Sequence, residues 1–235
     1  MSLQYYDESE IRKSVEILTD GLPFEVRIIY NDGKVRSGYF KGADTLIDEL
    51  AKLSLDDCNV YITLNKIHEG CYCRKQRDRF IEAKGKSAPS TSENDVIGFR
   101  WFLIDLDPKR PSGISSSDEE LRHAKVVALR VIDFMEGLDF DSCIIAISGN
   151  GIHLLYRIEE EATDENKHML AQCLKAVDAE CSDDIVKIDT VNFKKAQTGK
   201  LYGTLAQKGT NTPERPFRMS RIITLDELKE GVKDE

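Results

Sequence analysis

Two aspartates stand at the end of an apolar stretch near the middle of the chain. The run Phe99–Pro108 reads FRWFLIDLDP, a composition typical of a strand buried on both faces, and Asp105 and Asp107 lie at its end. Because side chains two residues apart on a strand point to one face, both carboxylates project together. A buried pair of like charges is unfavourable without a cation, and oxygen ligands suit Mg²⁺ or Mn²⁺. Alone, however, an Asp-x-Asp is more often a solvated strand end.

A glycine-flanked turn supplies groups that suit an anion. The segment Ser148–His153 reads SGNGIH and lies between two short apolar strands. Glycines let the backbone N–H groups of such a turn face an anion, and the imidazole of His153 can donate to a phosphate oxygen. The same letters also fit an ordinary Asn-Gly hairpin with a surface histidine.

Two later segments offer a third carboxylate and further cations. Asp189 ends the apolar strand Asp184–Asp189, where it either completes an oxygen cage with the first two aspartates or caps the strand. Lys200 opens the segment KLYGT, and Lys208-Gly209 follows it. Lysines in such loops bind phosphates and the glycines permit close approach, although each segment alone is only a basic loop.

The elements that must position these residues fall into two parts. Residues 1–95 predict a small mixed α/β lobe that ends in a basic loop, with helices over 8–20 and 43–53 and a hairpin at Asn31-Asp32-Gly33. From residue 96 the order is strand, helix, strand, strand, helix, strand. That order is the split βαβ arrangement of ferredoxin-like and RNA-recognition-motif (RRM-like) sheets. The predicted fold class is therefore α+β, with a catalytic lobe over residues 96–235 whose first helix begins at a Ser117/Glu120 capping box.

The composition is that of an ordinary globular protein. The chain has 235 residues, of which 40% are hydrophobic and 32% charged, enough to bury a sizeable core. No apolar run approaches the ~20 residues of a membrane span, and the N-terminus lacks the pattern of a signal peptide. Six cysteines without the rhythm of a disulfide framework favour free thiols in a reducing compartment. We therefore expect a cytoplasmic protein without a membrane partner.

The charge is unevenly distributed along the chain. The formal net charge is −9, yet basic residues outnumber acidic ones by seven to three over Lys66–Lys86 and by seven to one over Lys194–Arg221. Two basic segments on an acidic body are compatible with a localised polyanion site. The side chains that we expect to contact nucleic acid are Arg74, Lys75, Arg77, Arg79, Lys194 and Lys195.

Together, the four motifs resemble the archaeo-eukaryotic primase superfamily, and most closely the primase–polymerase (prim-pol) domains of plasmid, phage and other mobile-element replication proteins. The family's Asp-x-Asp is matched by Asp105 and Asp107, its Ser-Gly-x-Gly-x-His turn by Ser148–His153, and its strand-end aspartate by Asp189. In the nearest branch, Lys-Leu-Tyr-Gly-Thr and a downstream Lys-Gly follow, as they do here from Lys200. The resemblance covers about residues 60–223.

This resemblance implies a template-directed nucleotidyltransferase, a DNA primase or primase–polymerase, in which both lobes form one prim-pol domain. It implies a DNA template and primer and nucleoside triphosphates as partners, and it allows for a helicase or a primase C-terminal region in a longer parent protein. Asp105, Asp107 and Asp189 would be catalytic and would hold Mg²⁺ or Mn²⁺. The residues expected to bind the triphosphate are Ser148, Gly149, Gly151, His153, Lys200 and Lys208.

The chain departs from this branch at one place. Branch members carry an Arg three positions before the Lys of Lys-Leu-Tyr-Gly-Thr and an aromatic residue just before it, where this chain has Gln197 and Gly199. One phosphate or template contact is therefore either missing or supplied differently.

Other functions are less compatible with the sequence. A non-catalytic nucleic-acid-binding module of the same fold is the main alternative, although it would gain nothing from a repulsive carboxylate cluster. A rolling-circle nicking enzyme needs paired histidines and a P-loop ATPase needs Gly-x-x-x-x-Gly-Lys-[Ser/Thr]; the sequence contains neither a His-x-His nor that loop.

The cysteines are not expected to bind structural zinc. Such sites use paired cysteines at short gaps, supplied twice, whereas Cys71 and Cys73 have only His68 close by in the sequence. Elemental analysis of protein purified without added metal should therefore find no stoichiometric zinc. One zinc ion per chain would contradict this expectation.

Overall fold

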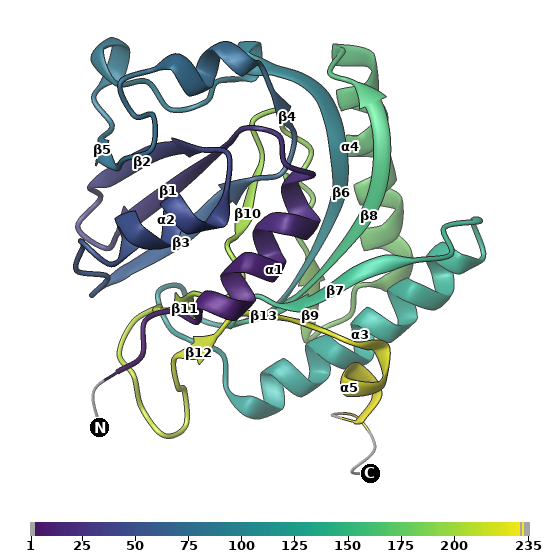
Figure 1. Cartoon of the computed structure of the whole chain (residues 1–235). Helices are drawn as coiled ribbons and strands as arrows, with labels where there is room; N and C mark the ends of the chain where they lie inside the picture. The colour runs from purple at the N-terminus through teal and green to yellow at the C-terminus, as the bar shows by residue number, and fades with distance from the viewer. Residues whose placement is uncertain (1–2, 231, 233–235) are drawn as a thin grey trace. The chain divides into compact units, whose positions relative to one another are not determined.

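The computed structural model describes residues 3–230 and 232, and its contacts divide the chain into two units. Unit 1 comprises the residues up to Arg100 together with Glu159–Ala162 and Lys194–Leu205. Unit 2 comprises Trp101–Ile158, Thr163–Phe193 and the residues from Ala206 onward. Both units combine helices with antiparallel sheets (Figure 1), so the predicted α+β class is confirmed.

Unit 1 is built on an antiparallel sheet with the strand order β10-β3-β1-β2-β5. Its strands are β10 (Thr198–Lys200), β3 (Cys58–Thr63), β1 (Phe24–Tyr30), β2 (Val35–Phe40) and β5 (Ile81–Glu82). The predicted hairpin joins β1 to β2, and Gly33 takes a φ of +87° in its turn, a conformation that favours glycine. Helices α1 (Glu8–Thr19) and α2 (Ala43–Leu50) pack against each other, and α2 also packs against β2.

The segment that joins β3 to the long strand β6 (Val96–Pro108) contains only short elements. They are β4 (Lys66–Ile67), β5 and the 3₁₀ turns η1 (Glu69–Cys73), η2 (Gly85–Ser87) and η3 (Glu93–Asp95). The β4 strand pairs with the first part of β6, with Lys66 opposite Gly98.

A buried carboxylate shows how unit 1 accommodates charge. Glu25 is fully buried in β1 and accepts hydrogen bonds from the Ser37 hydroxyl at 2.5 Å, the Arg27 guanidinium at 2.7 Å and the Thr91 N–H at 2.9 Å. Its lone pairs are therefore occupied by protein donors, as a charge removed from water requires.

Unit 2 contains the end of β6 and the strands that flank it. Its strands are β7 (Cys143–Ile147), the first part of β8 (Ile152–Glu161), β9 (Val186–Ile188), β12 (Arg218–Met219) and β13 (Arg221–Ile223). Neighbours in the sheet follow the order β13-β7-β8-β6, and β9 pairs with the end of β6. The short β11 (Leu205–Ala206) pairs with β12. The predicted glycine turn joins β7 to β8, with Ile147 opposite Ile152.

Three helices complete unit 2: α3 (Asp118–Glu136), α4 (Asp164–Cys181) and α5 (Leu225–Glu230). The α3 and α4 helices pack against each other and against β9. The predicted capping box is present, because the Glu120 N–H donates to the Ser117 hydroxyl at 3.1 Å and the Ser117 N–H donates to the Glu120 carboxylate at 2.9 Å. Among the helices of residues 3–230, none has the length and apolar character needed to cross a membrane.

Lys200, at the end of β10, is buried in unit 1. Its amino group donates to the carbonyl oxygen of Leu205 at 3.0 Å and to Oδ1 of Asn59 at 3.2 Å, and only 4% of the residue is exposed. Neither acceptor is charged, and burial disfavours an ammonium ion, so burial lowers the pKa of Lys200 to about 7.

The depressed pKa of Lys200 predicts a dependence of stability on pH. Between about 7 and the ordinary lysine pKa of 10.5, the unfolded chain holds a proton that the folded chain lacks. The free energy of unfolding should therefore rise with pH across this window, by at most about 1.4 kcal/mol per pH unit, and the Lys200 contribution should be flat below it. Lys200→Met should remove this slope.

Denaturant titrations of the wild type, Lys200→Met and Lys175→Met from pH 6 to pH 10 would measure the effect. Lys175 is an exposed lysine on α4, so its replacement should leave the slope unchanged. Equal slopes in the wild type and Lys200→Met would show that Lys200 keeps an ordinary pKa.

Candidate active site

Asp105 and His153 meet at the end of β6. The Nε2 atom of His153 lies 3.4 Å from Oδ1 of Asp105, and the two side chains are 6% and 23% exposed. Burial opposes the ionisation of Asp105. The charge and hydrogen bond of His153, followed by the charges of Lys208 and Arg110, nevertheless hold the pKa of Asp105 below its ordinary value. Asp105 is therefore an anion stabilised by a neighbouring imidazole.

Asp107 projects from the same face of β6 and is less well compensated. Burial and the negative charge of Asp105 raise the pKa of Asp107. The Arg110 guanidinium lies 3.4 Å from Oδ1 of Asp107, but it also donates to the carbonyl oxygens of Pro108 at 2.9 Å and Ile114 at 3.1 Å. The strand end thus retains a repulsion between like charges that a cation would relieve.

Asp189 directly follows the neighbouring strand β9 and is hydrogen-bonded to the backbone of Asp105. The N–H of Asp189 donates to the carbonyl oxygen of Asp105 at 2.9 Å, and the antiparallel register continues with Lys187 opposite Asp107. Residues opposite each other in such a pair project to one face of the sheet. The Asp189 carboxylate itself accepts from the N–H of Val191 at 3.0 Å.

The three aspartates do not form a ready-made cage. In the part of the chain that the structure describes, no three His, Cys, Asp or Glu side chains are grouped so that they could hold a metal ion. The donor set still fits a hard divalent cation in kind, because all three groups are carboxylates and the anion of Asp107 is disfavoured by burial and by the charge of Asp105.

The SGNGIH turn is closed by its own serine and packs against β6. The N–H of Gly151 donates to the Ser148 hydroxyl at 3.1 Å, and the carbonyl oxygen of Gly151 accepts from the Ser148 N–H at 3.0 Å. A Cβ atom on Gly151 would lie 2.2 Å from the carbonyl oxygen of Leu106 and 3.0 Å from Oδ1 of Asp107. Only glycine therefore lets the turn lie directly beside the carboxylates.

The other side of the turn is fixed by hydrogen bonds to residues distant in the sequence. The side chain of Asn150 accepts from the N–H of Ser116 at 2.9 Å, and the Arg218 guanidinium donates to the carbonyl oxygen of Ser116 at 2.8 Å. Gly149 has a φ of +108°, and a Cβ atom there would meet that of Ala206 at 2.2 Å. These are long-range contacts, which short sequence patterns do not reveal.

A shallow pocket rich in cations opens beside Asp107. Its volume is about 230 Å³, and its lining residues are Asp107, Pro108, Lys109, Arg110, Pro111, Ser112, Lys187 and Lys208. Of its four cationic residues, only Lys208 was expected from the sequence. One signal could have identified Lys187: it lies two residues before Asp189 and hence on the same strand face.

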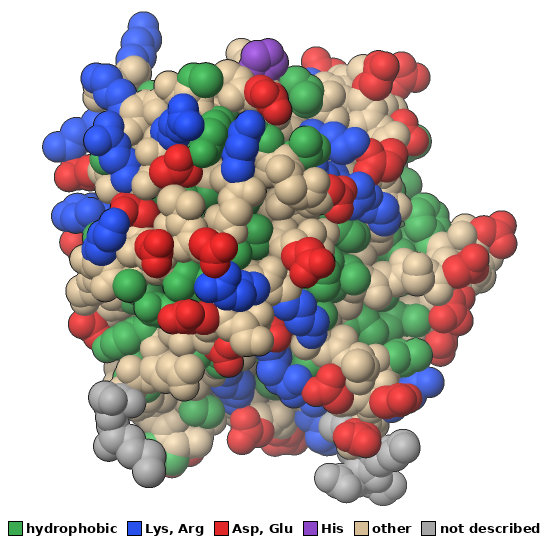
Figure 2. All heavy atoms as spheres, in the orientation of Figure 1, with side chains coloured by type: hydrophobic (Ala, Val, Ile, Leu, Met, Phe, Trp, Pro, Cys, Tyr) green, Lys and Arg blue, Asp and Glu red, His purple; other side chains and the backbone are tan. Residues whose placement is uncertain are grey.

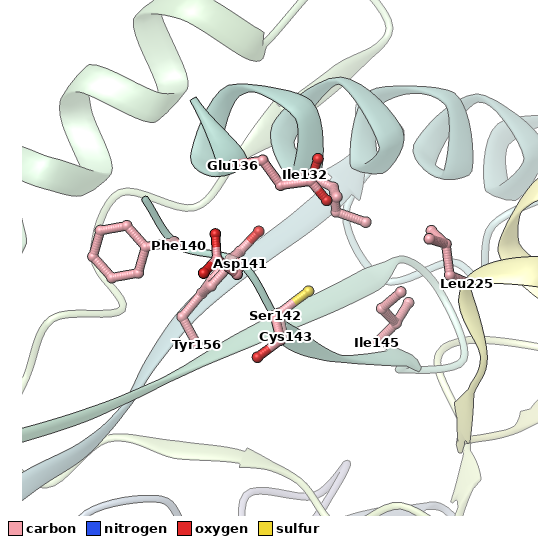
Figure 3. Close-up of a pocket in the computed structure, with 9 residues that line it drawn as sticks. All are labelled: Ile132, Glu136, Phe140, Asp141, Ser142, Cys143, Ile145, Tyr156 and Leu225. Atoms are coloured by element: carbon pink, nitrogen blue, oxygen red, sulfur yellow. The ribbon is translucent and has the colours of Figure 1, made fainter. Parts of the chain in front are cut away.

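A second pocket in unit 2 has a different character. It has a volume of about 190 Å³ and is enclosed by side chains of α3, β7, β8 and the start of α5 (Figure 3). Its walls are largely apolar, with the ring of Phe140 edge-on to that of Tyr156 at 5.7 Å, and its charged residues are Glu136 and Asp141. None of the nine labelled residues is a cation, so this pocket does not suit a phosphate.

The remaining predicted residues lie in unit 1. Lys200 is buried, as described above, and its role as a phosphate ligand stays a prediction. Arg74 is engaged within unit 1, since its guanidinium pairs with Asp95 at 2.6 Å and donates to the Tyr39 hydroxyl at 2.7 Å. Lys195 is half-buried. The exposed members of the set are Lys75, Arg77, Arg79 and Lys194.

Basic side chains gather on one part of unit 1. In Figure 2, Lys and Arg side chains cluster over the region that carries β2 and β5 in Figure 1. Contact of these side chains with nucleic acid stays a prediction.

The tight packing of Gly151 predicts that a single methyl group disturbs the site. Gly151→Ala should lower the free energy of unfolding by roughly 1–3 kcal/mol, because its Cβ atom would overlap a backbone oxygen that has little room to move. Gly137→Ala, at the end of α3, is a matched control, because its Cβ atom would come no closer than 3.3 Å to another atom. Chemical denaturation of both variants measures the difference, and equal stabilities would contradict the packing argument.

Comparison with known proteins adds information about the fold. No protein-family model and no curated protein sequence matches the chain. The crystal structure of the primase RepB′ is similar with a TM-score of 0.50 and 11% identity, over 95% of this chain and 61% of RepB′. The polymerase domain of Mycobacterium tuberculosis Ligase D, solved in complex with DNA, gives a TM-score of 0.47 and 14% identity, over 100% and 95% of the two chains.

At such identities the likeness to RepB′ concerns the fold alone. The chain spans 61% of the length of the RepB′ chain. The likeness to primase-type structures that the motifs predicted is confirmed at this level: the chain shares the fold of the primase RepB′.

Proposed function

We propose that this chain is a template-directed nucleotidyltransferase, a DNA primase or primase–polymerase. The observation that carries the proposal is the contact between Asp105 and His153, beside Asp107 and the SGNGIH turn, in a fold shared with the primase RepB′. Phosphoryl transfer depends mainly on positioning and on neutralising negative charge, and a carboxylate pair beside groups that bind phosphate offers both.

Asp105, Asp107 and Asp189 would hold the divalent cations, Mg²⁺ or Mn²⁺. The raised pKa of Asp107 supports this assignment, because burial and the charge of Asp105 disfavour its anion and a bound cation would stabilise it. When bound, such ions neutralise the charge of the transferring phosphoryl group and of the leaving pyrophosphate.

The chain's own residues would bind and orient the triphosphate. Asp105 fixes the imidazole of His153, which would donate to a phosphate oxygen at the strand end. Ser148 closes the turn that places Gly151 against Asp107, so the turn and the carboxylates would move as one body. The charge of Lys208 acts on both Asp105 and Asp107, which supports its role in attracting the triphosphate.

The sheet of unit 2 would form the catalytic lobe of the proposed enzyme. The strand order β7-β8-β6, with β9 paired to the end of β6, supports the split βαβ arrangement of a catalytic lobe. Both units would form one prim-pol domain, and a longer parent protein would add a helicase or a primase C-terminal region.

The exposed cations of unit 1 would contact the phosphate backbone of the template and primer. Such contacts position a strand without reading its sequence.

Asp105→Asn should separate catalysis from binding. The substitution keeps the shape of the side chain and removes a proposed metal ligand, so nucleotide incorporation should fall by about a hundredfold or more. Binding of the template should be unchanged or slightly tighter, because a charge that repels phosphate is lost. Asp133→Asn is the matched control, since Asp133 is exposed on α3.

The assay combines a template, a labelled nucleotide and Mg²⁺ or Mn²⁺, with and without a primer. The two arms distinguish primer extension from priming. If Asp105→Asn incorporates as well as the wild type, the proposed role of Asp105 as a metal ligand is wrong. If the wild type binds DNA but incorporates nothing with either metal, a non-catalytic nucleic-acid-binding module replaces the polymerase proposal.

A further inference from the structure

The pairing of β6 with β9 places a lysine among the carboxylates. Lys187 lies opposite Asp107, and the N–H of Asp189, directly after β9, donates to the carbonyl oxygen of Asp105. Cβ atoms of such opposite residues are about 4.5–5.5 Å apart. The pairing of the two strands therefore places the amine of Lys187 beside the carboxylate of Asp107.

The cations of the pocket beside Asp107 have different roles. Lys109 donates to the carbonyl oxygen of Asp183 at 2.8 Å, and Arg110 is hydrogen-bonded to the carbonyl oxygens of Pro108 and Ile114. These two side chains stabilise the wall of the pocket. By contrast, Lys187 and Lys208 are exposed, and within the described residues no hydrogen bond or ion pair engages either amino group.

The backbone fixes the position of Lys208 at the pocket. The Ser115 hydroxyl donates to the carbonyl oxygen of Lys208 at 3.0 Å. Gly209 has a φ of +74°, and a Cβ atom there would lie 2.3 Å from the carbonyl oxygen of Gly113. Lys208 therefore projects from a segment that is packed closely against the loop before α3, and its side chain alone has freedom to meet a ligand.

The charge of the pocket indicates the chemistry of its ligand. Its lining has four cationic side chains and one carboxylate, Asp107. Such an excess suits an anion of several charges, and lysine ammonium groups act on phosphates as point charges. A polyphosphate chain would also keep its oxygens within reach of any cation that Asp107 helps to hold.

We propose that this pocket is a polyphosphate-binding subsite, in which Lys187 and Lys208 bind the terminal phosphates of the triphosphate. The inference rests on the proposed nucleotidyl transfer and states where the pyrophosphate leaving group of that reaction would lie.

In that reaction the 3′-oxygen bonds to the α-phosphorus and its proton passes to water. The bond from the α-phosphorus to the bridging oxygen breaks, and pyrophosphate leaves with that oxygen. Lys187 is a substrate-binding residue that lies opposite Asp107 in the pairing of β6 with β9.

Titration of the full chain with inorganic tripolyphosphate, with and without Mg²⁺ and at low ionic strength, tests the subsite directly. Lys187→Gln should weaken this binding by about tenfold or more, as expected for the loss of a hydrogen bond to a charged group. Lys187→Arg should restore most of it. Lys175→Gln, which removes an exposed lysine of α4, is the matched control and should bind like the wild type.

Steady-state incorporation provides the second measurement. Lys187→Gln should raise KM for the nucleotide by a similar factor and leave kcat and the affinity for a primer–template nearly unchanged. A primer-strand phosphate has the same chemistry as a polyphosphate. Loss of oligonucleotide binding with tripolyphosphate binding intact would therefore assign the pocket to DNA and overturn the proposal.

The two proposals fail in different ways. If the wild type incorporates nucleotides and Lys187→Gln changes neither KM nor tripolyphosphate binding, the subsite is wrong and the proposed function stands. If tripolyphosphate binding depends on Lys187 but the wild type incorporates nothing, the subsite stands and the proposed function is wrong.

Discussion

The repulsion between Asp105 and Asp107 is the constraint on which the rest of the site depends. Both carboxylates lie at the end of a strand that is otherwise apolar, and neither has the full set of protein donors that Glu25 has in unit 1. His153 stabilises the first carboxylate, and Arg110 only partly offsets the second. Folding free energy alone does not favour such a pair, and carboxylates with shifted pKa values gather at functional sites in proteins.

Much of this arrangement follows from local sequence patterns. The apolar run of β6, the glycine turn and the Ser117/Glu120 capping box depend on residues a few positions apart, and each was predicted correctly. The place of Lys187 opposite Asp107 depends on a register between strands far apart in the sequence. Likewise, Lys200 was expected to bind phosphate from a basic loop, and the pairing of β10 with β3, which leaves that side chain buried, was not foreseen. Such pairings are not encoded in a short motif.

A shared fold and a shared reaction are separate claims. The likeness to RepB′ at 11% identity establishes the fold, whereas the chemistry has to be argued from the side chains at the site. The KLYGT segment illustrates the difference. Gly203, with a φ of +90°, lies so close to α1 that a Cβ atom would approach the backbone nitrogen of Ile11 to 2.6 Å. Part of this motif therefore serves the packing of unit 1 whether or not its lysine meets a nucleotide.

The close approach of Gly151 to Leu106 has a consequence for the divergence of such proteins. Any amino-acid substitution at this glycine adds a Cβ atom, so the backbone itself opposes drift at this position. A descendant that no longer carried out any reaction would be free to change Asp105 or Lys187, yet it would still be restricted to glycine at position 151. Among homologues, this glycine would therefore be retained wherever the fold is retained, whereas the charged residues around it would be free to vary independently of the fold.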